Sequence, residues 1–190
     1  MVVFMLVRAD NSVVFVVDIQ DKLLPVVHDN ASLLKNVVLL LETASTLSIP
    51  QLVSEQYPQG LGETVAGVKR VVTQGGLQGA GFLEKVCFSA VRADRFDEAL
   101  APYDDRRQAV VVGIEAHICV LQTALDLRVR GFEVFVVADG VSSRRESDRD
   151  KALARLRDNG CHIVTTEMVL FEWLGKAGTP LFKQVSKAIR

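Results

Sequence analysis

Asp18 is the first residue whose type and place suggest chemistry. It directly follows an apolar run at residues 13–17, so its carboxylate would stand at the carboxyl end of a buried strand, where open α/β sheets bind ligands. That place suits a general base. A carboxylate that bonds loop amides or caps a helix is the alternative interpretation.

Cys119 stands near the start of a helical pattern, shortly after an apolar run that ends at Gly113. Unpaired amides and the positive end of the helix dipole lower the pKa of a thiol at such a place, and the same amides could receive an oxyanion. We therefore expect a nucleophile with a lowered pKa. A small residue that packs the helix against the sheet is the alternative.

Lys85 lies among apolar neighbours, where its ammonium could stabilise a thiolate and a carboxylate. By itself it could equally be a surface lysine with a buried stem. Cys87 is a rival nucleophile, but no helix start is evident there, and Cys161 begins a strand and is expected in the core.

No metal or cofactor motif accompanies these residues. The three histidines do not pair at ligand spacings, and no phosphate-loop or dinucleotide-binding glycine pattern is present. His117, two residues before Cys119, could influence the thiol or touch a substrate, and an exposed histidine at a helix start is the alternative. We expect neither a metal site nor a cofactor.

The elements that must position these residues alternate between strands and helices. Strands are expected at residues 13–17, 51–54, 70–73, 108–113, 133–138 and 161–165, and helices at residues 32–47, 94–101, 117–130, 147–159 and 181–189. Gly131 and Gly160 follow two of the helices as C-terminal caps. Residues 55–87 are rich in glycine and predict loops around one strand and a short helix. The alternation predicts an α/β fold with a three-layer, doubly wound, mostly parallel sheet of about six strands, Rossmann-like in arrangement.

Composition narrows the class of protein. The 190 residues are 49% hydrophobic and carry a net charge of -1, which indicates one globular domain over residues 1–190 and gives little electrostatic support for binding nucleic acid or membranes. Three cysteines without a CxxC pair predict a reducing, cytoplasmic location, and a mitochondrial one is left open. The apolar start is too short for a membrane span.

Three ordered motifs resemble those of the isochorismatase-like cysteine hydrolases. They are Val-Val-Asp-Ile-Gln at residues 16–20, the segment around Lys85, and Gly-Ile-Glu-Ala-His-Ile-Cys-Val-Leu-Gln-Thr-Ala at residues 113–124. Residues 54–62, 137–144 and 165–167 resemble the isochorismatase domain-containing subgroup. The resemblance runs nearly end to end and implies a catalytic triad of Asp18, Lys85 and Cys119. It also implies a cis peptide between Ile114 and Glu115, with an oxyanion site at the amides of Glu115 and Cys119.

Two departures narrow the choice within that family. Nicotinamidases carry an Asp-x-His metal motif where this sequence has Ser54, Glu55, Gln56 and Tyr57, so a metal-dependent nicotinamidase is disfavoured. Isochorismatases proper cleave a vinyl ether without a nucleophilic cysteine, so Cys119 favours covalent acyl chemistry.

The sequence thus predicts a hydrolase that cleaves a small amide or related carbonyl compound through a thioester. Residues that flank the motifs are expected to line the substrate pocket: Gln20, Gln56, Tyr57, Phe88, His117 and Ile118. A non-catalytic binding or scaffold protein and, less favoured, a nuclease are the alternatives. We expect a small-molecule substrate and a homo-oligomer of two or more copies, because apolar residues at 1–7 and 171–174 exceed what one sheet needs to cover.

Overall fold

A six-stranded parallel sheet forms the centre of the computed structural model, which describes residues 6–74 and 82–189. Within these residues the strands are Ser12–Val17 (β1), Gln51–Gln56 (β2), Phe82–Lys85 (β3), Gln108–Ile114 (β4), Glu133–Ser142 (β5) and His162–Val164 (β6). The α-helices are Asn30–Thr46 (α1), Pro58–Leu61 (α2), Ala66–Gln74 (α3), Phe96–Leu100 (α4), Leu121–Val129 (α5), Glu146–Asp158 (α6), Thr166–Leu174 (α7) and Pro180–Ile189 (α8). Short 3₁₀ turns occupy Ala9–Asn11, Leu24–Val26, Ala90–Arg92 and Ala101–Tyr103, and a π-helical turn occupies Ala116–Val120.

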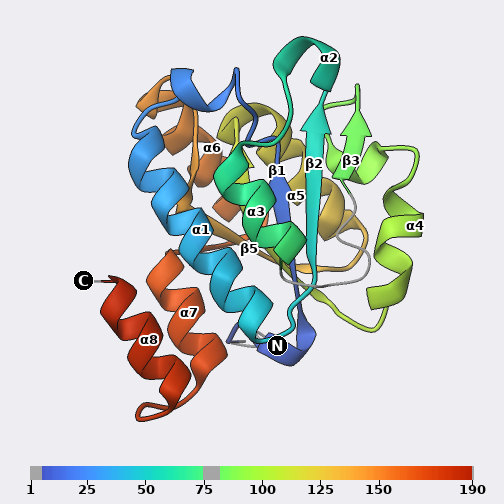
Figure 1. Ribbon diagram of the computed structural model, residues 1–190. Coiled ribbons are helices and arrows are strands. Elements are labelled where there is room, and N and C mark those ends of the chain that lie inside the picture. Colours follow the sequence, from blue (N-terminus) through green and yellow to red (C-terminus); the bar gives the residue numbers. More distant parts are fainter. Residues whose placement is uncertain (1–5, 75–81, 190) are drawn as a thin grey trace.

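The strands follow the order β3-β2-β1-β4-β5-β6, and every pairing is parallel. Helices α1, α3, α7 and α8 lie on the near side of the sheet in Figure 1, and α5 and α6 lie on the far side. The expected three-layer, doubly wound α/β fold is therefore confirmed, and the sheet is wholly parallel.

Two apolar clusters, one on each face of the sheet, form the core. Val14 and Val16 of β1 belong to the cluster under α1, whereas Val13, Phe15 and Val17 belong to the cluster under α5. Because both faces of β1 are buried, its sequence is a continuous apolar run. The buried strand therefore gives a fixed position to Asp18, the residue that directly follows it.

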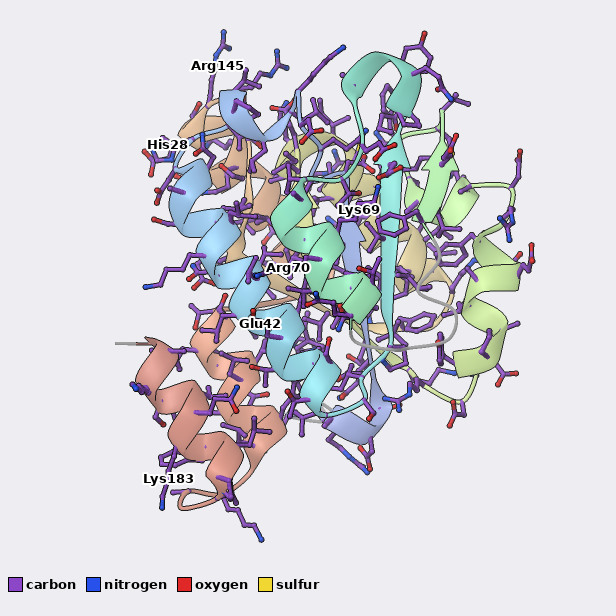
Figure 2. All side chains as sticks on the ribbon, in the orientation of Figure 1. His28, Glu42, Lys69, Arg70, Arg145 and Lys183 are labelled. Atoms are coloured by element: carbon purple, nitrogen blue, oxygen red, sulfur yellow. The ribbon has the colours of Figure 1, made fainter. Side chains whose placement is uncertain are left out.

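The strand expected at residues 70–73 is wrong, because this segment belongs to α3. Val68, Val71 and Val72 follow helical spacing and are buried where α3 packs on α1, so tertiary packing overrides the β preference of valine. Arg70 projects from α3 to within 4.0 Å of Glu42 on α1 (Figure 2). The true third strand is β3, a short edge strand whose last residue is Lys85.

The other expected elements are confirmed with small shifts of their ends. Gly131 and Gly160 follow α5 and α6 with φ of +85° and +80°, as expected of helix-capping glycines. Helix α7 was not predicted. Among the described residues, no helix is long and apolar enough to cross a membrane.

Candidate active site

The sheet changes its winding direction between β1 and β4, and this point organises the site. From β1 the chain continues outward through β2 and β3, and from β4 it continues through β5 and β6 on the other side. Ligands of open α/β sheets bind at the carboxyl ends of strands beside such a point. Asp18 follows β1, Lys85 ends β3 and Cys119 lies in the turn after β4, so the three residues meet at one edge.

Asp18 and Lys85 form a buried ion pair. Nζ of Lys85 lies 2.7 Å from Oδ2 of Asp18, and neither side chain is exposed. The hydroxyl of Ser54 donates to Oδ1 of Asp18 at 2.7 Å. Nζ of Lys85 also donates to Oε1 of Gln56 at 2.7 Å and to the carbonyl oxygen of Phe88 at 3.1 Å. These extra bonds matter because a buried ion pair offsets its desolvation only when its remaining polar atoms are also satisfied.

The backbone at Asp18 turns sharply out of β1. Its φ of +53° lies in the left-handed region, which residues other than glycine adopt mainly where the surroundings hold them. The amide of Asp18 donates to the carbonyl of Ser54 at 3.1 Å, and its carbonyl accepts from the amide of Gln20 at 2.9 Å. These two bonds fix the carboxylate at the rim of the sheet.

Cys119 lies in the π-helical turn Ala116–Val120 and is only 6% exposed. Its burial raises the pKa of the thiol far above the ordinary value, and the negative charge of Asp18 raises that pKa further. Lys85 acts in the opposite direction with a smaller effect. The lowered pKa expected from a helix start is therefore wrong in direction, because desolvation outweighs the favourable charges. The resting side chain is a thiol beside a carboxylate.

The peptide bond between Ile114 and Glu115 is cis, at the position to which the resemblance assigned it. Gly113 precedes it with φ of +131°, and a side chain there would place Cβ 2.0 Å from the carbonyl oxygen of Val17. Oε2 of Glu115 accepts from the amide of Arg144 at 2.9 Å and from its Nε at 3.1 Å. The loop before Cys119 is thus held both by β1 and by the segment after β5.

Gln20 and Gln56 bond each other, and Gln56 also bonds the lysine. Gln20 is fully buried, and its side-chain amide bonds the backbone of Gln56 in both directions, with Gln56 N to Oε1 at 2.8 Å and Nε2 to the Gln56 carbonyl at 3.0 Å. Gln56 in turn bonds Lys85 through its side chain. These contacts hold the ends of strands together, and any contact of either residue with substrate stays a prediction.

A hollow of about 420 Å³ lies beside the lysine. Tyr57 and Lys85 are among its lining residues, whereas Asp18, Cys119 and Phe88 are not among those lining this hollow in the described part of the chain. Tyr57 is 53% exposed and Phe88 is 52% exposed. Tyr57 thus stands at the rim of the hollow, and Phe88 is joined to the site through its carbonyl oxygen, which accepts from Lys85.

His117 and Ile118 directly precede Cys119 within the same π-helical turn. Nδ1 of His117 lies 2.9 Å from the hydroxyl oxygen of Ser143. Ile118 is partly buried and packs against the apolar cluster on that face. Neither lines the hollow beside Lys85 in the part of the chain that the structure describes.

The end of β2 presents no cluster for a metal ion. The carboxylate of Glu55 accepts from the amide and the hydroxyl of Thr64, each at 2.6 Å. Across the described residues, no group of three or more histidine, cysteine, aspartate or glutamate side chains is placed to hold a metal.

A comparison of the sequence with protein families shows the family of this chain. Residues 12–168 match the isochorismatase domain. The chain belongs to the isochorismatase family. Isochorismatase domain-containing protein 2 of Danio rerio is 38% identical over 94% of this chain and 87% of the relative. Members of the isochorismatase family are hydrolases, and that general class now applies to this chain.

Two solved structures share the fold of this chain. A protein described as the MAR1 ribonuclease of Caenorhabditis elegans is 35% identical, with a TM-score of 0.87 over 97% of this chain and 92% of that one. The YcaC gene product of Escherichia coli, described as an octameric hydrolase of unknown specificity, is 22% identical with a TM-score of 0.90 over 99% and 92% of the two chains. The second likeness concerns the fold alone.

Ser54 is the residue of this isochorismatase-family site that sequence reasoning missed. Sequence patterns assign Ser54 to an expected strand, to a segment that resembles the subgroup and to the absent metal motif, yet its hydroxyl donates to the carboxylate of Asp18. A signal was present: Ser54 and Gln56 alternate along a buried strand and so point to one face. Polar residues on that face of a buried strand require polar partners.

Proposed function

We propose that this chain hydrolyses a small amide, or a related carbonyl compound, through a thioester on Cys119. The observation that carries the proposal is the fully buried Asp18–Lys85 ion pair, which acts on the buried thiol of Cys119. A perturbed thiol beside a carboxylate and an ammonium, at the carboxyl edge of the sheet, is typical of a reactive site rather than of core packing.

In the first step, Asp18 accepts the thiol proton while Sγ attacks the carbonyl carbon. The electron pair of the carbonyl moves onto its oxygen, and the amides of Glu115 and Cys119 receive the oxyanion, as the family resemblance implies. A base is needed at this moment because burial raises the pKa of Cys119, so little thiolate is available in advance. Lys85 holds the carboxylate and balances the negative charge.

In the second step, the intermediate collapses and the carbon–nitrogen bond breaks. Asp18 returns its proton to the leaving nitrogen, which departs as ammonia or an amine. Water then attacks the thioester carbon while Asp18 accepts a water proton, the carbon–sulfur bond breaks and the thiolate is reprotonated. The products are a carboxylic acid and the regenerated thiol.

The hollow beside Lys85 is the proposed entrance for the substrate. Its rim carries Tyr57, and the exposed residue Phe88 bonds Lys85 through its carbonyl oxygen. Gln56, His117 and Ile118 remain proposed contacts of the bound molecule. Gln20 is instead proposed to support the end of β2, because its side chain bonds the backbone of Gln56. The buried ion pair has no net charge, which favours a substrate that is uncharged at its reacting carbonyl.

The test is turnover of a panel of small amides by the purified protein, followed as ammonia or amine release. Cys119→Ala should lower turnover by about 10³-fold or more, the scale for removing a catalytic nucleophile. Cys161→Ala is the matched control, because Cys161 is also a buried cysteine but lies directly before β6. Full turnover by Cys119→Ala would refute the proposal. A mass increase on Cys119 equal to the acyl group, trapped by rapid quenching, would support it directly.

A binding or scaffold role is the first alternative. It predicts that no amide in the panel is turned over and that no acyl adduct forms on Cys119.

A nuclease is the second alternative, and RNA is the substrate to test because the C. elegans relative is described as a ribonuclease. The net charge of -1 offers little attraction to phosphates. RNA degradation that persists in Cys119→Ala through repeated purification would favour it over amide hydrolysis.

We also propose that the chain forms a homo-oligomer in the cytoplasm. Met168 and Phe171 of α7 are 46% and 40% exposed, and such apolar side chains favour an interface. Val7 and Trp173, which had suggested the same, are buried within the chain, and residues 1–5 lie outside the described residues. Light scattering tests the assembly, and a monomer at high concentration would refute it.

The three unpaired cysteines support the proposed cytoplasmic location, because such a location is reducing.

A further inference from the structure

Gln56 bonds both the side chain of Lys85 and the backbone of the residue that follows it, in a fixed orientation. It is the last residue of β2. Its side-chain oxygen accepts from Nζ of Lys85 at 2.7 Å, and its side-chain nitrogen donates to the carbonyl oxygen of Val86 at 2.9 Å. Because the nitrogen has its own acceptor, the amide is held with its oxygen toward the lysine.

The ammonium of Lys85 has three oxygen acceptors. It bonds Asp18 Oδ2 at 2.7 Å, Gln56 Oε1 at 2.7 Å and the carbonyl oxygen of Phe88 at 3.1 Å. An ammonium has three N–H groups, so three acceptors set its position completely. Two of the three acceptors are neutral, which leaves Asp18 as the one carboxylate bonded to Lys85 in the described part of the chain.

The backbone of Gln56 is itself held by the residue two positions after Asp18. The side-chain amide of Gln20 bonds both the N–H and the carbonyl of Gln56, at 2.8 and 3.0 Å, and also donates to the carbonyl of Gly62 at 2.6 Å. The contacts therefore close a ring from Asp18 through Lys85 and Gln56 to Gln20. A ring of mutually bonded groups, three of them buried and Gln56 half-buried, holds its members more rigidly than separate pairs do.

We propose that Gln56 is a positioning residue that acts on the reactivity of Cys119 only through Lys85, by holding the ammonium in place with a neutral acceptor. The proposal rests on the proposed function in one respect, that Lys85 assists the thiol. A neutral acceptor suits this task because a second carboxylate would offset the positive charge that favours the thiolate. Gln56 then contributes to the chemistry without needing to contact the substrate.

The readout is the rate at which iodoacetamide alkylates Cys119, resolved from Cys87 and Cys161 by peptide mass mapping over a range of pH. Gln56→Met keeps the length of the side chain and removes the acceptor. We expect it to slow alkylation of Cys119 by about 3- to 10-fold at a given pH, up to the effect of one pKa unit. Gln56→Glu should slow it further, because it adds negative charge beside Lys85. The rate at Cys87 serves as an internal reference.

Gln51→Met is the matched control variant. Gln51 is a buried glutamine at the other end of the same strand, and its side-chain nitrogen donates to the carbonyl of Leu41 at 3.1 Å and to Ser45 Oγ at 2.8 Å. Its replacement removes comparable hydrogen bonds far from the site. Gln51→Met should lower the unfolding midpoint but leave the alkylation of Cys119 unchanged. A slowing equal to that of Gln56→Met would show a general loosening of the sheet and overturn the proposal.

The decisive comparison uses a background without the ion pair. Asp18→Asn combined with Lys85→Met removes both charges together and so leaves no unpaired buried charge. If Gln56 acts only through Lys85, Gln56→Met should not change the alkylation rate of Cys119 any further in this background. The same fold-change as in the native protein would overturn the proposal, as would an unchanged rate in Gln56→Met alone. Since alkylation needs no substrate, this outcome is separate from the amide panel that tests the proposed function.

Discussion

The carboxylate of Asp18 and the ammonium of Lys85 lie 2.7 Å apart, and neither side chain is exposed to solvent. The two residues come from the ends of β1 and β3, with β2 between them. Such a pair is costly to disturb, because each charge is stable in the interior only while the other is present.

Removing one partner should therefore cost more than removing both. We expect Lys85→Met to lower the free energy of unfolding by about 3–5 kcal/mol, because it leaves the carboxylate of Asp18 buried without a counter-ion. The double variant Asp18→Asn/Lys85→Met should recover part of that loss. Urea denaturation measures both. Additive losses in the double variant would contradict the coupling.

Asp18→Asn should separate turnover from thiol reactivity. Turnover should fall by about 10²-fold or more, because the proton acceptor is gone. Alkylation of Cys119 by iodoacetamide should instead become faster, because the negative charge that raises the pKa of the thiol is removed. Parallel assays of the two rates give the answer. A fall in turnover with no gain in alkylation would mean that Asp18 does not act on Cys119 electrostatically.

Stability should decline in alkaline solution. Burial raises the pKa of Cys161 from an ordinary value of 9.0 to about 11, so above pH 9 the unfolded chain releases a proton that the folded chain retains. The free energy of unfolding then falls by up to about 1.4 kcal/mol per pH unit for this thiol until the pH reaches its folded pKa. Cys119 adds a loss of the same sign.

Cys161→Ala isolates the contribution of that thiol. Its overall stability should be lower because a buried side chain is shortened, but its decline between pH 9 and 11 should be less steep than that of the native protein. Denaturation curves at several pH values provide the slopes. Parallel slopes for the two proteins would show that Cys161 titrates alike in the folded and unfolded chains.

Two glycines with positive φ should respond differently to alanine. At Gly113 a Cβ would lie 2.0 Å from the carbonyl oxygen of Val17, whereas at Gly131 nothing lies within 4 Å. We expect Gly131→Ala to cost about 1–2 kcal/mol from backbone conformation alone. Gly113→Ala should cost about 2–5 kcal/mol, because steric overlap with β1 is added. Thermal unfolding of both variants compares them, and equal losses would show that β1 yields without cost.

The sequence by itself determined the fold class and two positions in the site. Valine-rich runs such as residues 13–17 and 108–113 alternate with helical patterns, and burial of both faces of a parallel sheet leaves few other arrangements. Asp18 was found because it ends an apolar run, and Cys119 because a helical pattern begins near it. These are local signals, carried by neighbours along the chain.

Only the tertiary structure decided what depends on residues far apart in sequence. Residues 70–73 form a helix because their valines pack on α1. The pKa of Cys119 is raised rather than lowered because desolvation depends on everything packed around the thiol, not on the helix start alone. The bonds from Lys85 to Asp18 and Gln56 join residues at the carboxyl ends of three different strands. Such partners are set by strand order and register, which bring together side chains that local sequence patterns do not relate.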